Sequence, residues 1–375
     1  MYYIGTTQNI NVGICNEAKI NGMDLVRIPF DVIKSATDNF IGYNQIGSGA
    51  VYKGRLTHGN NRGKYVDVKR FDKGSAQGAR VFYRELDILL KFKHKNVINL
   101  EGYCDENDEK AIVYEHSFHG SLDKHLNDAR LKWVERLKMC IDIASGLEFL
   151  HGGLLRRESV IHRNIRSSNV LLSVSRKAKI TGFGHSLISP INQEMDYIID
   201  DHIVRKSHYS DPTYMQTGIL TRQSDIYSFG VILFEMLCGR AAHTYRDSQP
   251  FASVVKHHVE EGKIDDIVFK EFDKQIEVES FDIFFSIAYQ CIDDDREKRP
   301  TASQVLQQLM KAWECQADFE IWERKLPTDF TEIVVQMSRS NKINSKMMKK
   351  DLYHMFCEGI LLQGDKVISS SVDVG

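Results

Sequence analysis

The sequence lacks the features that mark secreted, membrane-spanning or nucleic-acid-binding proteins. Its 375 residues carry 49 basic and 51 acidic side chains, and the formal net charge of −2 favours neither nucleic acid nor a membrane surface. The most apolar stretch, Phe229 to Leu237, contains Glu235 and is too short to span a bilayer. No basic segment precedes a long apolar run at the N-terminus, so we expect no signal peptide.

The cysteine pattern and the first residues predict a protein without disulfides or a myristoyl group. The seven cysteines are odd in number and include no C-x-x-C pair, which indicates free thiols in a reducing compartment. Tyr2 stands where myristoylation requires glycine. We therefore expect a cytoplasmic protein without a transmembrane segment.

Residues 25–116 are expected to be rich in β-strands. A run that ends at Lys69 alternates apolar and polar residues, which places Asp67 and Lys69 on one face of a strand. One helix is predicted from about Ser75 to Phe92, and Glu85 lies within its apolar stripe. A carboxylate in that position needs a cationic partner if it is buried.

The rest of the chain predicts a helical body between two polar ends. Residues 117–316 read mostly as helix, and the segment 224–239 is apolar nearly all round, which predicts a helix at the centre of a large lobe. Residues 1–24 are polar without a sustained period, so we expect a poorly ordered lead-in. Residues 317–375 are richer in lysine and serine and form the predicted C-terminal tail.

Two motifs resemble the catalytic and metal-binding loops of protein kinases. His162-Arg163-Asn164-Ile165-Arg166-Ser167-Ser168-Asn169 is similar to H-R-D-x-x-x-x-N, and Gly182-Phe183-Gly184 is similar to D-F-G. The chain also carries, in the family's order, SATDNF at 35–40, EGYC at 101–104, IVYEHSFHGSL at 112–122 and LTRQSDIYSFGVILFEMLCGR at 220–240. Over about 275 residues it resembles plant receptor-like and receptor-like cytoplasmic kinases, a serine/threonine kinase family.

This resemblance implies an α+β, two-lobed kinase fold, with a small β-rich lobe at 25–116 and a large helical lobe at 117–316. It also implies that Lys69 binds the α- and β-phosphates of ATP and that Glu85 holds this lysine. Further positions carried over from the family are the gatekeeper Tyr114, the adenine-binding hinge Glu115 to Ser117, the nucleotide-binding Val51 and Leu171, the second metal ligand Asn169, and the interlobe column Leu89, Tyr103, His162 and Phe183 with its anchor Asp225.

The two carboxylates that run phosphoryl transfer in the family are absent. Asn164 stands at the catalytic-base position, and an amide cannot accept the proton of a hydroxyl substrate. Gly182 stands at the magnesium position and leaves Asn169 as the only metal ligand from these motifs, a weak one. Arg166 replaces the catalytic-loop lysine, which keeps the charge but changes its geometry.

The phosphate-covering loop is also altered. Where the family reads close to I-G-x-G-G-F-G-x-V-Y-K-G, this chain reads IGSGAVYKG at 46–54. Three residues are missing, and of the G-x-G-x-x-G glycines only Gly47 and Gly49 remain. We expect a shortened hairpin tip that covers the phosphates poorly.

Two more departures affect the adenine pocket and the substrate platform. Asp67 replaces an alanine and is expected to point at the adenine roof, where it would repel polyphosphate and could capture Lys69; the alternative is that Asp67 turns to solvent. In the segment 205–214, which resembles the family's platform for a peptide substrate, Lys206 replaces a threonine and Thr213 replaces a glutamate. In the family that glutamate pairs with an arginine, and Arg299 is the matching arginine here. Arg299 therefore needs another partner or remains solvated.

The C-terminal tail is expected to be a solvated linker that ends in a fragment. A basic cluster in it offers the alternative of peripheral contact with anionic lipid or an acidic partner; its members are Arg339, Lys342, Lys346, Lys349 and Lys350. The string KKDLYHMFCEGILLQGDKV at 349–367 resembles the entry to a phloem-lectin-like β-domain. Too few residues follow for a complete sandwich, so we expect a fragment with one helix and no sugar binding.

Two functional interpretations remain open from the sequence. The first is a pseudokinase: a non-catalytic scaffold, decoy or allosteric partner that binds other kinases or receptor complexes, with no cofactor and no nucleic acid. The second is an ATP- and magnesium-dependent serine/threonine kinase with weak or unconventional transfer, which would use Lys69, Asn169 and a substitute carboxylate such as Asp67.

Overall fold

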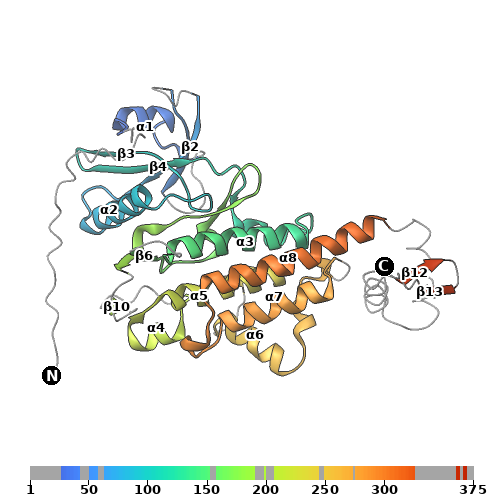
Figure 1. The fold of residues 1–375 in the computed structure, drawn as a ribbon. Helices are drawn as coiled ribbons and strands as arrows, with labels where there is room; N and C mark the ends of the chain where they lie inside the picture. The colour runs from blue at the N-terminus through green and yellow to red at the C-terminus, as the bar shows by residue number, and fades with distance from the viewer. Residues whose placement is uncertain are drawn as a thin grey trace, which may run out of the picture.

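A four-stranded antiparallel sheet forms the small lobe (Figure 1). Its order is β1-β2-β4-β3, with β1 at Val51–Arg55, β2 at Tyr65–Arg70, β3 at Leu100–Glu106 and β4 at Glu109–Glu115. Val66 and Val68 of β2 are buried on one face, so Asp67 and Lys69 point to the other, as the alternation predicts. The computed structural model describes residues 27–42, 50–57, 63–152, 158–190, 198–199, 207–244, 249–272, 275–325, 360–363 and 366–369.

A short helix that the sequence did not predict covers the outer face of this sheet. Helix α1, Phe30–Ala36, buries Ile33 and Ala36 against Val66 and Val68. Only two of its seven residues are buried, which is too few for an apolar period to be visible in the sequence. The small lobe therefore contains two helices in its described part and not the single one expected.

Helix α2, Ala76–Lys91, packs against the inner face of the sheet and agrees with the prediction of about Ser75 to Phe92. The Ser75 hydroxyl accepts a hydrogen bond from the Gly78 N–H and caps the helix. Phe82 and Leu89 are buried in the main hydrophobic cluster, and Glu85 is buried on the same side. The apolar stripe thus carries a carboxylate into the protein interior.

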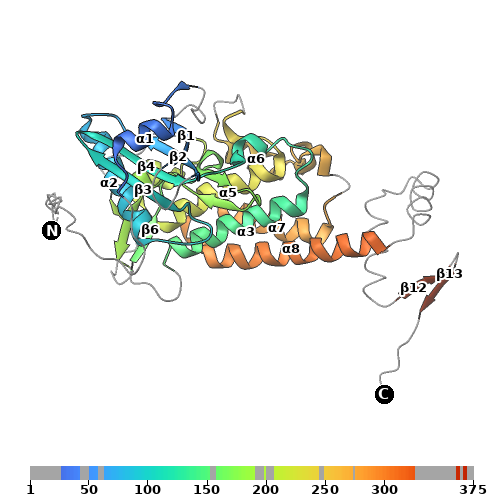
Figure 2. The same ribbon diagram turned by 90° about the horizontal axis from the view of Figure 1, so that it is seen from above.

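The large lobe is built around a fully buried helix. Helix α5, Arg222–Cys238, has every residue from Ser224 to Cys238 buried, as the all-round apolar pattern predicts. Helices α3, α7 and α8 pack together alongside it (Figure 2). The helices of this lobe are α3 at Trp133–Leu150, α4 at Pro212–Thr217, α5, α6 at Phe251–Glu260, α7 at Val278–Cys291 and α8 at Ala302–Lys325.

Short strands and 3₁₀ turns connect the helices of the large lobe. Three small antiparallel sheets, β5-β7-β8, β6-β9 and β10-β11, hold the loops that follow them. The strands are β5 at Gly120–Ser121, β6 at Glu158–Ile161, β7 at Val170–Leu172, β8 at Ala178–Ile180, β9 at Leu187–Pro190, β10 at Ile198–Ile199 and β11 at Ile219–Leu220. The 3₁₀ turns are η3 at Leu122–His125, η4 at Ser167–Asn169, η5 at Phe183–His185, η6 at Ala242–Thr244, η7 at Ile264–Asp266, η8 at Lys270–Phe272 and η9 at Arg296–Lys298.

The C-terminal part departs from the expected boundaries. Helix α8 runs through the predicted boundary at residue 316 and ends at Lys325. A hairpin of β12, Ile360–Gln363, and β13, Lys366–Ser369, lies in the tail, whereas the helix expected there and the lysine-rich cluster fall outside the described residues. Among the helices of the described chain, none has the length and apolar character needed to cross a membrane.

Candidate functional site

The predicted lysine–glutamate pair is formed at the inner face of the small lobe. Lys69 Nζ lies 2.6 Å from Glu85 Oε2, and the Tyr114 hydroxyl donates to Glu85 Oε1 at 2.9 Å. Burial, together with the neighbouring Glu85 carboxylate, raises the pKa of Tyr114 well above its usual value, so this phenol remains a donor. The buried glutamate therefore has two donors, one from β2 and one from the gatekeeper position at the end of β4.

Asp67 bonds to the hinge and not to Lys69. Its Oδ2 accepts the Ser117 N–H at 3.0 Å and the Ser117 hydroxyl at 2.6 Å, and its Oδ1 lies 2.6 Å from His116 Nδ1. Asp67 is only 2% exposed. Both expectations about its partner are therefore wrong: Asp67 neither turns to solvent nor captures Lys69, because its neighbour across the ladder, Tyr114, brings the following hinge residues within reach.

The interlobe column forms around the catalytic loop. The rings of His162 and Phe183 are in edge contact at 4.8 Å, and Phe183 lies in the same buried cluster as Leu89, with Tyr103 packed against it. His162 Nε2 is 3.0 Å from the Thr181 carbonyl oxygen, and burial lowers the pKa of this imidazole.

Asp225 anchors the catalytic loop as the family pattern implies. Its carboxylate accepts the backbone N–H groups of His162 at 2.7 Å and Arg163 at 2.8 Å, and it lies 3.1 Å from His151 Nε2. These bonds hold the backbone on which Asn164 and Arg166 are mounted.

Asn164 and Asn169, at the predicted base and second metal positions, are bonded to each other, and Gly182, at the first metal position, has no side-chain oxygen. Asn169 Nδ2 donates to the Asn164 carbonyl oxygen at 2.8 Å, which orients this side chain within the loop. Gly182 has φ +88°, and a Cβ added there would lie 3.0 Å from Asn169 Cγ. An aspartate at 182 would thus need a left-handed backbone and a shift of Asn169. No cluster of three or more histidine, cysteine or acidic side chains suited to a metal occurs among the residues described.

The remaining nucleotide-binding positions are partly described. Val51 opens β1 opposite Lys69, and Leu171 lies on β7 between Ser121 and Lys179. Glu115 takes part in the hinge and accepts bonds from Lys179 Nζ at 2.5 Å and from the Asn99 N–H at 2.9 Å. Gly47 and Gly49 lie outside the described residues, so the shortened loop stays a prediction.

The substrate platform has a new internal ion pair. Arg299, which lacks its expected glutamate, lies 2.9 Å from Asp211, and Arg296 lies 2.8 Å from the same carboxylate. Burial alone would raise the pKa of Asp211, but the bonds from Arg299 and the other donors lower it. Lys206 lies outside the described residues. Asp211 follows Ser210 in the sequence, and nothing in the sequence alone distinguished it as the replacement partner.

A second buried carboxyl group lies behind the platform. The Tyr209 hydroxyl donates to Glu235 Oε1 at 2.5 Å, and the Ala242 N–H donates to the same oxygen at 2.7 Å. Burial raises the pKa of Glu235 to about 7. The sequence marks Glu235 only as an interruption of an apolar run, so its role as a partner of the platform was not foreseen.

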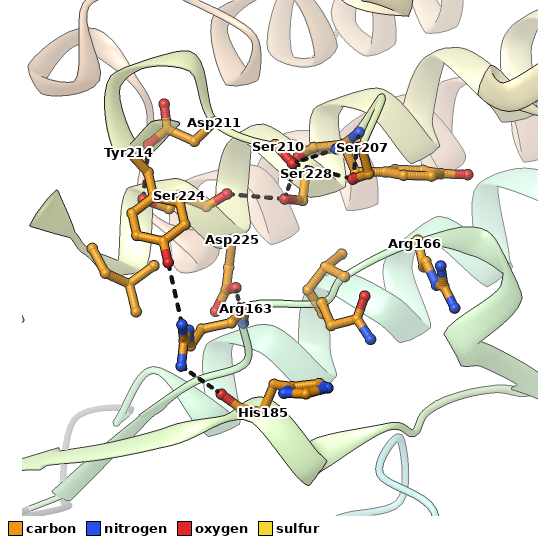
Figure 3. A pocket seen from close by; sticks show the side chains of 14 residues that line it. Arg163, Arg166, His185, Ser207, Ser210, Asp211, Tyr214, Ser224, Asp225 and Ser228 are labelled. Atoms are coloured by element: carbon orange, nitrogen blue, oxygen red, sulfur yellow. Dashed lines mark hydrogen bonds between the residues drawn. The ribbon is translucent and has the colours of Figure 1, made fainter. Parts of the chain in front are cut away.

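A cavity of about 320 Å³ lies between the catalytic loop and the platform (Figure 3). Arg163, Asn164 and Arg166 line it from the catalytic loop, and Ser207 and Ser210 line it from the platform. Arg163 donates to the His185 carbonyl oxygen at 3.2 Å and to the Tyr214 hydroxyl at 3.2 Å. The cavity is polar, and Asn164, at the predicted base position, contributes an amide to its lining.

Comparison with known proteins places these observations in a family. A family model described as protein tyrosine and serine/threonine kinase matches residues 41–309. The receptor-like protein kinase HERK 1 of Arabidopsis thaliana is 37% identical over 300 residues, covering 77% of this chain and 35% of the relative. The receptor-like protein kinase FERONIA of the same species is 35% identical over 301 residues, covering 78% and 33%. The chain spans about a third of the length of these curated relatives. It belongs to the protein kinase family, among the plant receptor-like kinases.

Proposed function

We propose that this protein is a pseudokinase that acts as a non-catalytic scaffold or allosteric partner for other kinases or receptor complexes. The observation that carries the proposal is the set of bonds from Asp67 to the hinge. The replacement of the base aspartate by Asn164 and of the magnesium aspartate by Gly182 also supports it. The family of the relatives supports receptor complexes as the class of partner.

The hinge bonds oppose nucleotide binding at the adenine end. The Ser117 N–H is one of the backbone groups expected to meet adenine, and it donates to Asp67. A nucleotide that used this N–H would have to break its bond to Asp67, whose buried carboxylate would keep only the Ser117 hydroxyl and His116 as partners. A hydrogen bond to a charged group is worth about 1.5–3 kcal/mol, so the loss of this bond should weaken nucleotide binding by about ten- to a hundredfold.

The residues at the phosphate end do not fit a magnesium–nucleotide complex. Gly182 provides no side-chain oxygen, so the Asn169 side-chain oxygen is the one metal ligand left by these two motifs, and the bond of the Asn169 amide nitrogen to the Asn164 carbonyl only orients it. Without held magnesium, the charge that develops on a transferred phosphoryl group is not neutralised. Asn164 also removes general-base assistance, which is worth about 10²–10⁴-fold in rate.

The parts that remain are those that fix the shape of a kinase. Lys69 and Tyr114 hold Glu85, and the contact of His162 with Phe183 connects the catalytic loop to the interlobe cluster. Asp67 adds a tie between the sheet and the hinge that requires no ligand. We infer that the two lobes keep an assembled arrangement without nucleotide and present it to a partner.

A thermal-shift titration tests this proposal. Purified protein is titrated with ATP, with and without Mg²⁺ or Mn²⁺, and we expect the melting temperature to remain unchanged. Binding to the native state must stabilise it by an amount set by the ratio of ligand concentration to Kd. A magnesium-dependent rise of several degrees would contradict the proposal.

The alternative is an ATP-binding kinase with weak transfer, and the preserved Lys69–Glu85 pair favours it. Its weak point is the substitute carboxylate. Asp67 is buried and bonded to His116 and Ser117, so it is not placed to hold a metal at the phosphates. Magnesium-dependent nucleotide binding that is lost in Lys69→Ala would favour this alternative.

A further inference from the structure

The cavity between the catalytic loop and the platform has its acidic groups neutralised. Two aspartates, Asp211 and Asp225, line it. Asp211 is paired with Arg296 and Arg299, and Asp225 accepts two backbone N–H groups of the catalytic loop. Neither carboxylate presents an uncompensated negative charge to the cavity.

The rim of the cavity carries an available cation. Arg166 is exposed and lines the cavity, and no hydrogen bond or ion pair of its side chain is found within the described part of the chain. Figure 3 shows its guanidinium apart from the bonded groups around Arg163. A guanidinium presents a planar set of donors that matches an oxyanion.

A second arginine, Arg163, adds positive charge beside His185 in the same cavity. This imidazole lines the cavity wall. Burial is the largest cause that lowers its pKa, and the positive charges of Arg163 and Lys69 lower it further. Lys69 and Glu85 act in opposite directions and are paired with each other, so Arg163 is the uncancelled charge of the three. At position 164 the amide adds no negative charge, whereas the aspartate of an active kinase would.

Hydroxyl donors complete the rim. Ser207 and Ser210 bond to each other through their hydroxyl oxygens at 3.2 Å, and both line the cavity. A serine hydroxyl rotates freely enough to donate to an incoming oxygen atom. The lining is thus mostly polar and suits a short charged side chain.

We propose that this cavity binds a phosphorylated serine or threonine side chain from an extended segment of a partner protein. The phosphate pairs with Arg166, and the Ser207 and Ser210 hydroxyls give up their mutual bond and donate to its remaining oxygens. This inference rests on the proposed absence of catalysis, because a cleft that no longer transfers phosphate is free to retain a phosphorylated segment. The loss of the aspartate at 164 then favours binding, since a carboxylate there would repel the phosphate.

Fluorescence polarisation tests this with a labelled degenerate peptide library centred on phosphoserine and its unphosphorylated counterpart. EDTA is present and nucleotide is absent. We expect the phosphoserine library to bind at least tenfold more tightly, and Arg166→Gln to remove that preference. Arg176→Gln is the matched control, because Arg176 is a partly exposed arginine 3.6 Å from Glu135 that does not line the cavity. It should leave the preference intact.

Asn164→Asp gives a second, independent test by returning a negative charge to the cavity wall. It should weaken phosphoserine binding by about tenfold or more without changing the melting temperature greatly. Equal binding of the two libraries by the unmodified protein, or an unchanged preference in both Arg166→Gln and Asn164→Asp, would overturn the proposal. Phosphate transfer by the protein in a separate assay would instead contradict the proposed function, and the two failures are therefore distinguishable.

Discussion

At the scale of residues, Asp67 is the side chain on which the proposed loss of nucleotide binding depends. It shares a strand face with Lys69, as the alternation of β2 predicts, but the two side chains reach different partners. Lys69 lies opposite Ile112 and reaches Glu85, whereas Asp67 lies opposite Tyr114 and reaches the hinge. The sequence predicted that Asp67 lies at the adenine pocket. It could not predict the partners of Asp67, because His116 and Ser117 lie beyond the end of the β2–β4 ladder and their positions depend on how the chain turns there.

Asp67→Ala should open the adenine end of the cleft. The change frees the Ser117 N–H and leaves it to solvent or ligand, so the unfolding free energy should fall by about 1–3 kcal/mol. We expect adenosine, titrated without metal and followed by calorimetry, to bind at least tenfold more tightly than to the unmodified protein. Asp67→Asn is the control, since its amide fills the same space. A folded Asp67→Ala variant with unchanged adenosine affinity would contradict this role for Asp67.

At the scale of elements, a helix could be predicted only where its pattern of apolar residues was long enough to be recognised. Helices α2 and α5 have apolar patterns long enough to define them, and the structure confirms both. Helix α1 was missed because its seven residues bury only two side chains. Partners that come from distant elements were also missed: Arg299 meets Asp211, and Glu235 of α5 meets Tyr209 of the platform. Such contacts are set by packing of the lobes and have no local sequence signal.

The Glu235 carboxyl on α5 should make stability depend on pH. Its pKa is raised to about 7 by burial, so the folded state binds a proton that the unfolded state releases near the ordinary glutamate value. Stability from this group is present at low pH and is lost as pH rises towards 7, by roughly 3 kcal/mol in total.

Chemical denaturation between pH 4.5 and 8, compared for the unmodified protein and Glu235→Gln, measures this effect. The glutamine keeps an oxygen that can accept from Tyr209 and Ala242 but does not titrate. We expect the stability difference between the two proteins to shift in favour of the glutamine variant as pH rises, and to level off above pH 7. Parallel pH profiles would show that Glu235 is charged in the folded state across the range.

For the whole molecule, the kinase architecture is retained although the residues that perform its chemistry are changed. The two-lobed α+β fold and the family are confirmed, and both were evident because many motifs occur in the family's order. The interlobe column and the bonds of Asp67 to the hinge connect the lobes without a ligand, and the Lys69–Glu85 pair joins β2 to α2 within the small lobe. This combination of a preserved frame and the Asp67–hinge bonds is what the proposed role as a partner of other kinases requires.

The most direct measurement of the central claim is transfer of labelled γ-phosphate from ATP. Purified protein is incubated with magnesium and with a generic serine/threonine substrate, and incorporation into itself and the substrate is compared with that of Lys69→Ala. We predict equal background signals for the two proteins, because Asn164 and Gly182 replace the aspartates that supply the base and the magnesium ligand. Incorporation at least tenfold above the Lys69→Ala background would show a working kinase and would contradict the account.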